Sequence, residues 1–228
     1  MGTGNDVGTG EHGLSLHDRA FPDARFSVWG ATALWYPSVV GQIATTSRDV
    51  NAPRDRLREI LLERSIRFGD FTLTSGAKSK YYADVRQTSL HPEGALLIAT
   101  LLDPILAEYG VKAVGGLTLG ADPIVGAMIA WTQLQGRGLM GFLVRKEQKS
   151  HGTANRIEGP FDRSLPAAIV DDVITKGGSA LAAYDAVKEA GGDVRVVACV
   201  VDRGEGGAEQ FAELGVPFRS IFTIREFL

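Results

Sequence analysis

The stretch from Leu165 to Ser179 restricts the possible folds of this chain more than any other. It begins as a short apolar run, continues through two adjacent acids, Asp171 and Asp172, and ends in a small loop that contains glycine. Residues 180–190 then have the composition of a helix. The carboxyl end of a strand that leads into the amino end of a helix is where α/β proteins place anionic ligands. The stretch therefore predicts an α/β fold with a ligand site at this point.

The loop from Thr175 to Ser179 has the composition of a phosphate site. Gly177 and Gly178 let backbone N–H groups approach a ligand without obstruction by Cβ, and the two hydroxyl side chains at the loop ends add donors. The helix amino terminus adds unpaired N–H groups and partial positive charge. The acids before the loop would repel phosphate, but they suit sugar hydroxyls or the hydration shell of a magnesium ion. A sugar phosphate is therefore the expected ligand, and the glycine spacing matches neither a Walker loop nor a Rossmann fingerprint.

Predicted strands alternate with predicted helices along most of the chain. Helices are expected over residues 54–65, 93–109, 180–190 and 206–214, and from residue 122 onward. Strands are expected in the apolar run before the acid pair and over residues 111–116, 139–144, 194–201 and 218–224. This alternation predicts a doubly wound, mostly parallel sheet flanked by helices.

The chain is predicted to divide into two parts. Residues 1–52 have no clear period and are rich in glycine at their start, which favours a flexible extension. Residues 53–228 form the predicted folded domain. A hairpin is expected near its start, over residues 68–86, with Tyr81 and Tyr82 on opposite faces of one strand.

A second candidate for anion binding precedes the helix that begins near Asp122. Gly115, Gly116 and Gly120 are expected to form a loose loop there. Asp122 is the predicted N-cap of this helix, and Pro123 is its predicted first residue.

The charge balance and the single cysteine narrow the class of protein. Lys and Arg number 24 and Asp and Glu number 27, so the formal net charge is -3 and no bulk attraction to nucleic acid or membrane is expected. The most apolar early segment, residues 28–43, is interrupted by Pro37 and is too short for a membrane span. No secretory signal is recognisable. Cys199 lies in an apolar run and is predicted to be a buried thiol, which fits a reducing, cytoplasmic location.

A cationic segment, Arg145–Gly159, follows directly on a predicted strand. Its basic residues are Arg145, Lys146, Lys149, His151 and Arg156. Long loops without secondary structure are uncommon and are often functional, and basic groups on such a loop can close over a polyanion. A solvated basic turn explains the same residues equally well. The segment alone therefore leaves both interpretations open.

Taken together, the motifs resemble one known family. Ile169–Ser179 resembles the motif with which type I phosphoribosyltransferases bind phosphoribosyl pyrophosphate (PRPP). The sequence Arg-Lys-x-x-Lys-x-His-Gly that begins at Arg145 is similar to the catalytic loop of the orotate phosphoribosyltransferases. The hairpin segment Phe71–Tyr82 and the strand end Asp202–Gly204 also resemble that family. The resemblance covers about residues 54–228, with the motifs in the same order.

The resemblance implies a type I phosphoribosyltransferase fold with a small amino-terminal hood hairpin. It implies transfer of ribose 5-phosphate from PRPP to N1 of orotate, which gives orotidine 5'-monophosphate and pyrophosphate in de novo UMP biosynthesis. It also implies magnesium, bound through PRPP near Asp171 and Asp172 and not directly by protein ligands. The expected assembly is a homodimer that shares the loop 145–159 across its interface, and neither nucleic acid nor membrane is an expected partner.

The resemblance also assigns roles to individual residues. The implied catalytic residues are Asp171, Asp172, Lys146, Lys149 and His151. The implied PRPP-binding residues are Arg145, Lys146, Lys149, His151, Asp171, Asp172, Thr175, Lys176, Gly177, Gly178 and Ser179. The implied orotate-binding residues are Tyr81, Tyr82, Thr175 and Arg203. In these roles the acid pair positions the ribose and favours positive charge at its reacting carbon, and the cations neutralise the leaving pyrophosphate.

The sequence departs from the family pattern at two places. Thr74 stands where some members carry a lysine, and Leu117–Asp122 contains no lysine where some members carry one. The pyrophosphate contacts are therefore expected to differ in detail.

Two alternative functions share part of this pattern. A purine phosphoribosyltransferase would share the acid pair and the phosphate loop but lack the cationic segment. A regulatory, nucleotide-binding member of the fold would bind without turnover, usually with a degraded cationic segment.

Overall fold

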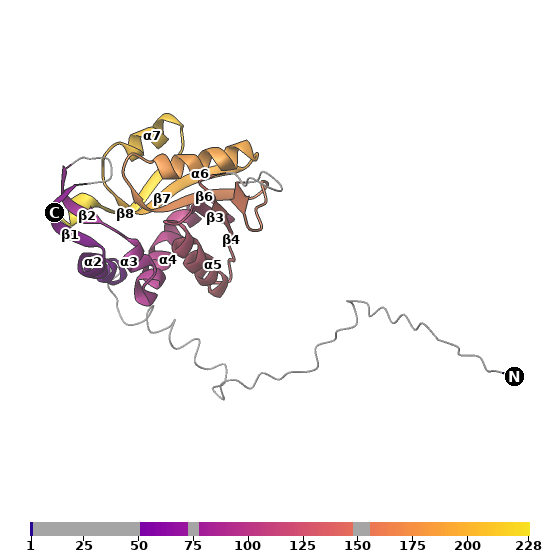
Figure 1. Cartoon of the computed structure of the whole chain (residues 1–228), viewed down its shortest axis with the longest axis horizontal. Helices are drawn as coiled ribbons and strands as arrows, with labels where there is room; N and C mark the ends of the chain where they lie inside the picture. The colour runs from indigo at the N-terminus through magenta and orange to yellow at the C-terminus, as the bar shows by residue number, and fades with distance from the viewer. Residues whose placement is uncertain (2–50, 73–77, 148–155) are drawn as a thin grey trace. The chain divides into compact units, whose positions relative to one another are not determined.

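A six-stranded sheet with helices on both faces forms the main body of the structure (Figure 1). The computed structural model describes Met1 and residues 51–72, 78–147 and 156–228. The strand order is β5-β4-β3-β6-β7-β8, and each neighbouring pair is parallel except β4 with β5. The strands of this sheet are β3 (Ala113–Leu117), β4 (Met140–Val144), β5 (Ile157–Glu158), β6 (Pro166–Ile174), β7 (Asp193–Asp202) and β8 (Phe218–Thr223).

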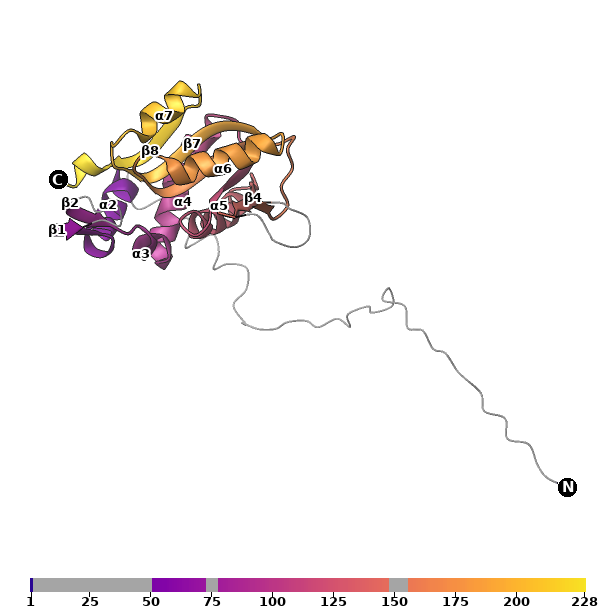
Figure 2. The ribbon, with the colours of Figure 1, turned by 45° about the horizontal axis from the view of Figure 1, so that its top comes forward.

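Helices α4 and α5 cover one face of the sheet, and α6 and α7 cover the other (Figures 1 and 2). The helices are α2 (Ala52–Arg64), α3 (Arg86–Ser89), α4 (Pro92–Ala107), α5 (Asp122–Leu134), α6 (Gly178–Glu189) and α7 (Gly207–Glu213), with a final 3-10 turn, η1 (Ile224–Glu226). Each face has its own apolar cluster. The predicted doubly wound, mostly parallel fold is therefore confirmed.

Strand β7 shows why this sheet must be covered on both sides. Val196 and Ala198 pack into the cluster that contains α4, whereas Val197 and Cys199 pack into the cluster that contains α6. Side chains alternate between the two faces of a strand, so an unbroken apolar run is buried only if both faces are covered. The prediction that Cys199 is a buried thiol is confirmed.

The chain reverses its direction of winding between β3 and β6, which are neighbours in the sheet. β3 continues through α5 to β4 on one side, and β6 continues through α6 to β7 on the other side. Such a reversal leaves a crevice at the carboxyl ends of the two strands, where open α/β sheets bind their ligands.

A separate two-stranded antiparallel sheet forms the hood hairpin. It consists of β1 (Ile66–Thr72) and β2 (Lys78–Ala83), while residues 73–77 lie outside the described part of the chain. Tyr81 packs against the main apolar cluster, and Tyr82 is 42% exposed. The prediction that these two rings lie on opposite faces of the strand is therefore confirmed.

Two details of the turn before α5 were predicted wrongly. Gly115 and Gly116 lie inside β3 and are buried, so they are not part of a loose loop. Ala121 is the N-cap of α5, which makes Asp122 the first helical residue and Pro123 the second. The anion-binding candidate is therefore reduced to the short turn between β3 and α5.

The predicted amino-terminal extension falls almost wholly outside the described residues, because residues 2–50 are not described. The division of the chain at residue 52 stays a prediction. Within the described residues, no helix combines the length and the apolar character that crossing a bilayer requires.

Candidate active site

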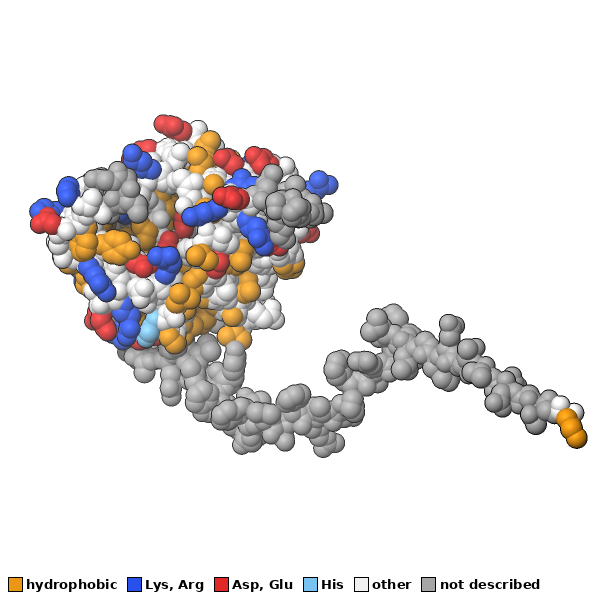
Figure 3. Space-filling view, viewed as in Figure 1, with side chains coloured by type: hydrophobic (Ala, Val, Ile, Leu, Met, Phe, Trp, Pro, Cys, Tyr) orange, Lys and Arg blue, Asp and Glu red, His pale blue; other side chains and the backbone are white. Residues whose placement is uncertain are grey.

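A cavity of about 510 Å³ lies at the carboxyl ends of β3 and β6, where the winding reverses. Six residues predicted from the sequence line it, namely Lys146, Asp171, Asp172, Thr175, Ser179 and Arg203. The other lining residues are Ala83, Asp84, Arg86, Leu117, Thr118, Leu119, Gly120 and Val173. Acidic and basic side chains lie next to one another near the middle of the face shown in Figure 3. The structure therefore brings the acid pair, the phosphate loop and cationic groups from three segments together.

The acid pair lies within β6, because this strand continues to Ile174. Asp171 lines the cavity but is only 4% exposed, so its carboxyl group is almost fully buried. The backbone N–H of Asp172 donates to Oδ1 of Asp171 at 2.9 Å, and the N–H of Val173 donates to Oδ1 of Asp172 at 2.8 Å. These bonds fix both carboxyl groups at the cavity wall.

Burial also controls the charge of the acid pair. Burial, followed by the negative charge of Asp172, raises the pKa of Asp171 to about 8. Burial likewise raises the pKa of Asp172, although the N–H of Val173 and the charge of Arg86 oppose this effect. The ligand-free pair therefore retains a proton near neutral pH, and a ligand that brings hydrogen-bond donors or positive charge favours the fully ionised form.

The turn after β3 packs directly against the acid pair. A Cβ at Gly120 would lie 2.7 Å from Oδ1 of Asp172 and 2.9 Å from Oδ1 of Asp171. A Cβ at Gly116 would lie 2.1 Å from the carbonyl oxygen of Val170. Since real Cβ atoms do not approach other atoms so closely, glycine at these two positions allows β3 and its turn to reach the site.

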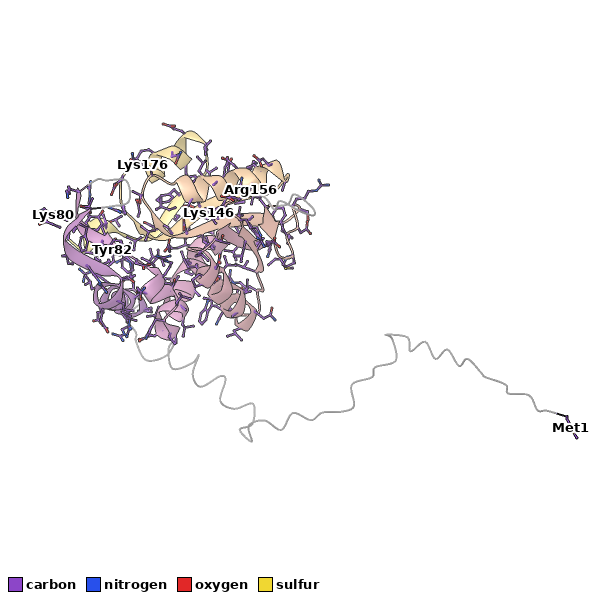
Figure 4. The ribbon with its side chains drawn as sticks, in the orientation of Figure 1. Met1, Lys80, Tyr82, Lys146, Arg156 and Lys176 are labelled. Carbon is purple, nitrogen blue, oxygen red and sulfur yellow. The ribbon has the colours of Figure 1, made fainter. Side chains whose placement is uncertain are left out.

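The phosphate loop joins β6 to α6. Gly177 is the N-cap of α6 with φ 84°, a left-handed conformation that glycine adopts without strain. A Cβ at Gly178 would have no atom within 4 Å, so the backbone there faces open space. Lys176 is exposed and does not line the cavity, and Figure 4 shows it beside α7 and apart from Lys146. Thr175 and Ser179 thus line the cavity at the two ends of the loop, whereas Lys176, Gly177 and Gly178 are not among its lining residues.

The cationic segment is anchored at its base by β4 and β5. Val144 pairs with Ile157, and the N–H of Arg145 donates to the carbonyl oxygen of Arg156 at 2.8 Å. Nε of Arg145 lies 2.8 Å from Oε1 of Glu158. The expectation that this segment has no structure of its own is wrong at its carboxyl end, where Ile157–Glu158 form β5.

The predicted cations of this segment occupy different positions. Lys146 lines the cavity, whereas Arg145 does not and is instead paired with Glu158. Lys149 and His151 lie outside the described residues, so their predicted roles are untested.

Arg203 connects the end of β7 to the hood hairpin. Its Nε donates to the hydroxyl oxygen of Tyr81 at 3.0 Å, and its guanidinium carbon lies 4.7 Å from the centre of the Tyr81 ring. Another nitrogen of the same guanidinium lies 3.0 Å from Oε1 of Glu205. The ring of Tyr82 lies instead against Phe71, with centres 5.8 Å apart. Neither tyrosine is among the residues that line the cavity, so Tyr81 reaches it only through Arg203.

Curated proteins match most of this chain. The orotate phosphoribosyltransferase of Rhodopirellula baltica is 43% identical over 188 residues, which are 80% of this chain and 97% of that protein. The orotate phosphoribosyltransferase of a Bradyrhizobium strain is 43% identical over 182 residues, which are 78% of this chain and 98% of that protein. The chain belongs to the orotate phosphoribosyltransferase family. No protein-family model matches the chain.

Solved structures of orotate phosphoribosyltransferases share this fold. The enzyme of Mycobacterium tuberculosis in complex with PRPP is 36% identical with a TM-score of 0.66, and the match covers 76% of this chain and 98% of that chain. The same enzyme in complex with Fe(III) dicitrate is 38% identical with a TM-score of 0.69, over 76% and 98% of the two chains. The family and the fold predicted from the motifs are therefore confirmed.

The orotate phosphoribosyltransferase cavity includes two charged residues that sequence reasoning missed. Asp84 and Arg86 line it from the start of α3, a helix that was not predicted. The spacing Asp-x-Arg directly after the hairpin strand is the only sequence signal for them. A helix of one turn has no hydrophobic period to reveal it.

The protein alone supplies only part of a magnesium site. Among the described residues, no group of three or more His, Cys, Asp or Glu side chains is arranged to hold a metal ion. Burial is the main cause of the raised pKa of Asp171, so a cation bound nearby would favour the ionised form of this carboxyl group. Carboxylate oxygens accept hydrogen bonds from the water shell that Mg²⁺ keeps around it. The residues present therefore suit an ion held mainly by substrate phosphates.

Proposed function

We propose that this chain transfers ribose 5-phosphate from PRPP to N1 of orotate and releases pyrophosphate. The observation that supports this reaction best is the single cavity that Asp171, Asp172, Thr175, Ser179 and Arg203 line together. It combines donors for a phosphate, acceptors for sugar hydroxyls and a cation for an orotate carboxylate. These match the 5-phosphate and the ribose hydroxyls of PRPP and the carboxylate of orotate, and the diphosphate of PRPP is the fourth group to be bound.

The donor substrate is proposed to lie along β6. Its 5-phosphate accepts hydrogen bonds from the loop Thr175–Ser179 and from the amino end of α6. Its ribose hydroxyls donate to Asp171 and Asp172. Fixed carboxylates beside the sugar stabilise the positive charge that develops on C1 of the ribose as its bond to the diphosphate lengthens.

The proposed transfer is a direct displacement. N1 of orotate releases its proton to solvent and supplies the electron pair of the new bond to C1. The bond between C1 and the diphosphate oxygen breaks with its electrons on the leaving group. Orotate is an anion with an acidic ring nitrogen, so the site needs no strong general base. Arg203, held against Tyr81, is proposed to bind the carboxylate of orotate.

The departing diphosphate requires positive charge. Lys146 lines the cavity and is proposed to contact it, together with Arg145, Lys149 and His151 when the segment closes. Bound magnesium would add charge neutralisation at the diphosphate, with Asp171 and Asp172 accepting hydrogen bonds from its water shell. Lys176 and the backbone of Gly177 and Gly178 are proposed to add to the field around the 5-phosphate.

The proposed assembly is a homodimer that shares the loop 145–159 across its interface, with Lys149 and His151 of one protomer acting in the cavity of the other and Lys146 lining the cavity of its own chain. The proposed setting is UMP biosynthesis in a reducing cytoplasm, which suits the free thiol of Cys199.

One assay tests the reaction. The full chain is incubated with PRPP and Mg²⁺, and loss of orotate absorbance is followed, with adenine, hypoxanthine and uracil as control bases. Orotate alone should be consumed, and pyrophosphate should appear in equal amount. Asp171→Asn and Asp172→Asn should each lower turnover by about 100-fold, the usual cost of losing one preorganised electrostatic group. Consumption of a purine base, or normal orotate turnover by the double variant, would reject the assignment.

A further inference from the structure

Arg86 is a cavity cation to which the proposed reaction gives no role so far. In the described part of the chain, the cationic side chains that line the cavity are those of Arg86, Lys146 and Arg203. The motifs account for Lys146 and Arg203 but not for Arg86. The substrates bring three anionic groups to this cavity, namely the 5-phosphate, the diphosphate and the orotate carboxylate. A cation that lines the cavity is therefore a candidate to bind one of them.

Asp84 holds Arg86 by one edge of its guanidinium group. Nε of Arg86 donates to Oδ1 of Asp84 at 2.8 Å, and the N–H of Asp84 donates to the carbonyl oxygen of Ser65 at 2.9 Å. The hydrogen bond from Arg86 is the main reason why the pKa of Asp84 is lowered, so this carboxylate stays charged. The terminal nitrogens of Arg86 have no hydrogen bond to any residue that the structure describes. The guanidinium therefore keeps its two terminal donor groups for a ligand.

The position of Arg86 indicates which part of PRPP it can contact. The phosphate loop fixes the 5-phosphate end of the ribose, and the acid pair fixes the ring. C1, which carries the diphosphate, is at the other end of the sugar and must lie beyond the acid pair. Arg86 belongs to that side, because it interacts electrostatically with Asp172 and because α3 packs against α5, which follows the Gly120 turn directly.

We infer that Arg86 binds the diphosphate of PRPP with its terminal nitrogens and that Asp84 is the positioning residue that orients it. The inference rests on the proposed function. A guanidinium is suited to this task because its planar donors match two phosphate oxygens at once, which an ammonium cannot do. The diphosphate is thus held from the hood side by Arg86 and from the β4 side by Lys146.

Binding experiments with separate parts of the substrates test the inference. Inorganic pyrophosphate with Mg²⁺, ribose 5-phosphate and orotate are titrated by calorimetry into the full chain and its variants. Arg86→Gln should weaken pyrophosphate binding by about 10- to 100-fold, the loss expected for a charged hydrogen-bond partner. Ribose 5-phosphate and orotate should bind within about twofold of the unaltered chain. Arg86→Lys should recover part of the loss, and Asp84→Asn should give a smaller loss of the same kind.

Lys80→Gln is the matched control for a lost cation on the hood side. Lys80 is 84% exposed, is paired with Asp70 and does not line the cavity. This variant should bind pyrophosphate normally. If Arg86→Gln fails to fold, Arg86→Lys is tested for a rise in KM for PRPP at unchanged KM for orotate.

Three results would overturn the inference. Unchanged pyrophosphate binding in Arg86→Gln would show that the guanidinium does not reach the diphosphate. Weaker orotate binding alone would assign Arg86 to the acceptor. A loss for ribose 5-phosphate equal to that for pyrophosphate would show that Arg86 acts through Asp172 or through α3. Failure of the unaltered chain to form orotidine 5'-monophosphate would instead reject the proposed function.

Discussion

The hydroxyl oxygen of Tyr81 accepts a hydrogen bond from Nε of Arg203 across 122 positions of sequence. The same tyrosine ring lies under the guanidinium, at 4.7 Å from its carbon. Tyr81 belongs to the hood hairpin, and Arg203 follows β7 of the central sheet. The hairpin therefore fixes a side chain that the central sheet supplies to the cavity.

Tyr81→Phe should raise KM for orotate by about three- to tenfold and change KM for PRPP little. The substitution removes a hydrogen bond to a charged group but keeps the ring under Arg203. Tyr109→Phe is the matched control, because Tyr109 also lies under an arginine, Arg219, but this arginine, unlike Arg203, does not line the cavity. An equal rise in both KM values would show that Tyr81 supports the whole site and not orotate binding.

The stability of the ligand-free protein should decrease as pH rises from about 4 to about 8. The pKa of Asp171 is about 8 in the folded chain and roughly 3.9 when unfolded. Between these values the folded state binds more protons, so raising the pH favours unfolding. Asp171→Asn should remove much of this decrease and raise the melting temperature at pH 8. Thermal unfolding curves from pH 5 to 9 would contradict this if both proteins showed the same slope.

Gly178→Val should weaken PRPP binding without unfolding the protein. A side chain at this position meets no protein atom within 4 Å, but it projects from a backbone that is proposed to approach the 5-phosphate. Gly126→Val provides the control, since Gly126 is also an open glycine but lies on α5, away from the 510 Å³ cavity. Normal PRPP affinity by calorimetry would exclude Gly178 from the phosphate site.

Removal of residues 1–48 should leave orotate turnover within about twofold, because every proposed site residue lies after them. The truncated chain is compared with the full chain in the same assay, and its thermal unfolding is measured as a control. A folded truncation without activity would place part of the site or of the dimer contact in the extension.

Mixing two inactive variants tests whether the cationic segment acts between protomers. Asp172→Ala and Lys149→Ala are combined in equal amounts under conditions that exchange subunits. Random pairing makes half of the dimers mixed, and each mixed dimer has one repaired site, so about a quarter of all sites should recover. If the segment serves its own protomer, every site keeps a lesion and no activity returns.

The sequence predicted the chemistry of the acid pair better than its environment. The order of acids, glycines and helix indicated a sugar phosphate, but composition alone could not show that β6 continues past Asp171 and buries it. Gly115 and Gly116 were predicted both as the end of the strand over residues 111–116 and as part of the loop after it. They lie in the strand, and they must be glycine because the ring of Phe142 and the carbonyl of Val170 occupy the space of their absent side chains. Such close approaches depend on partners distant in sequence, so no local pattern reveals them.

The rate at which thiol reagents modify Cys199 can report local opening of the folded chain. Cys199 is the single cysteine of the sequence, has no exposed surface and pairs in register with Asp171 directly below the cavity. Burial raises the pKa of its thiol, so the folded chain should resist thiol reagents. Modification must then await separation of the sheet from its helices. The rate of labelling with and without PRPP would therefore measure how strongly a bound substrate holds the centre of the sheet closed.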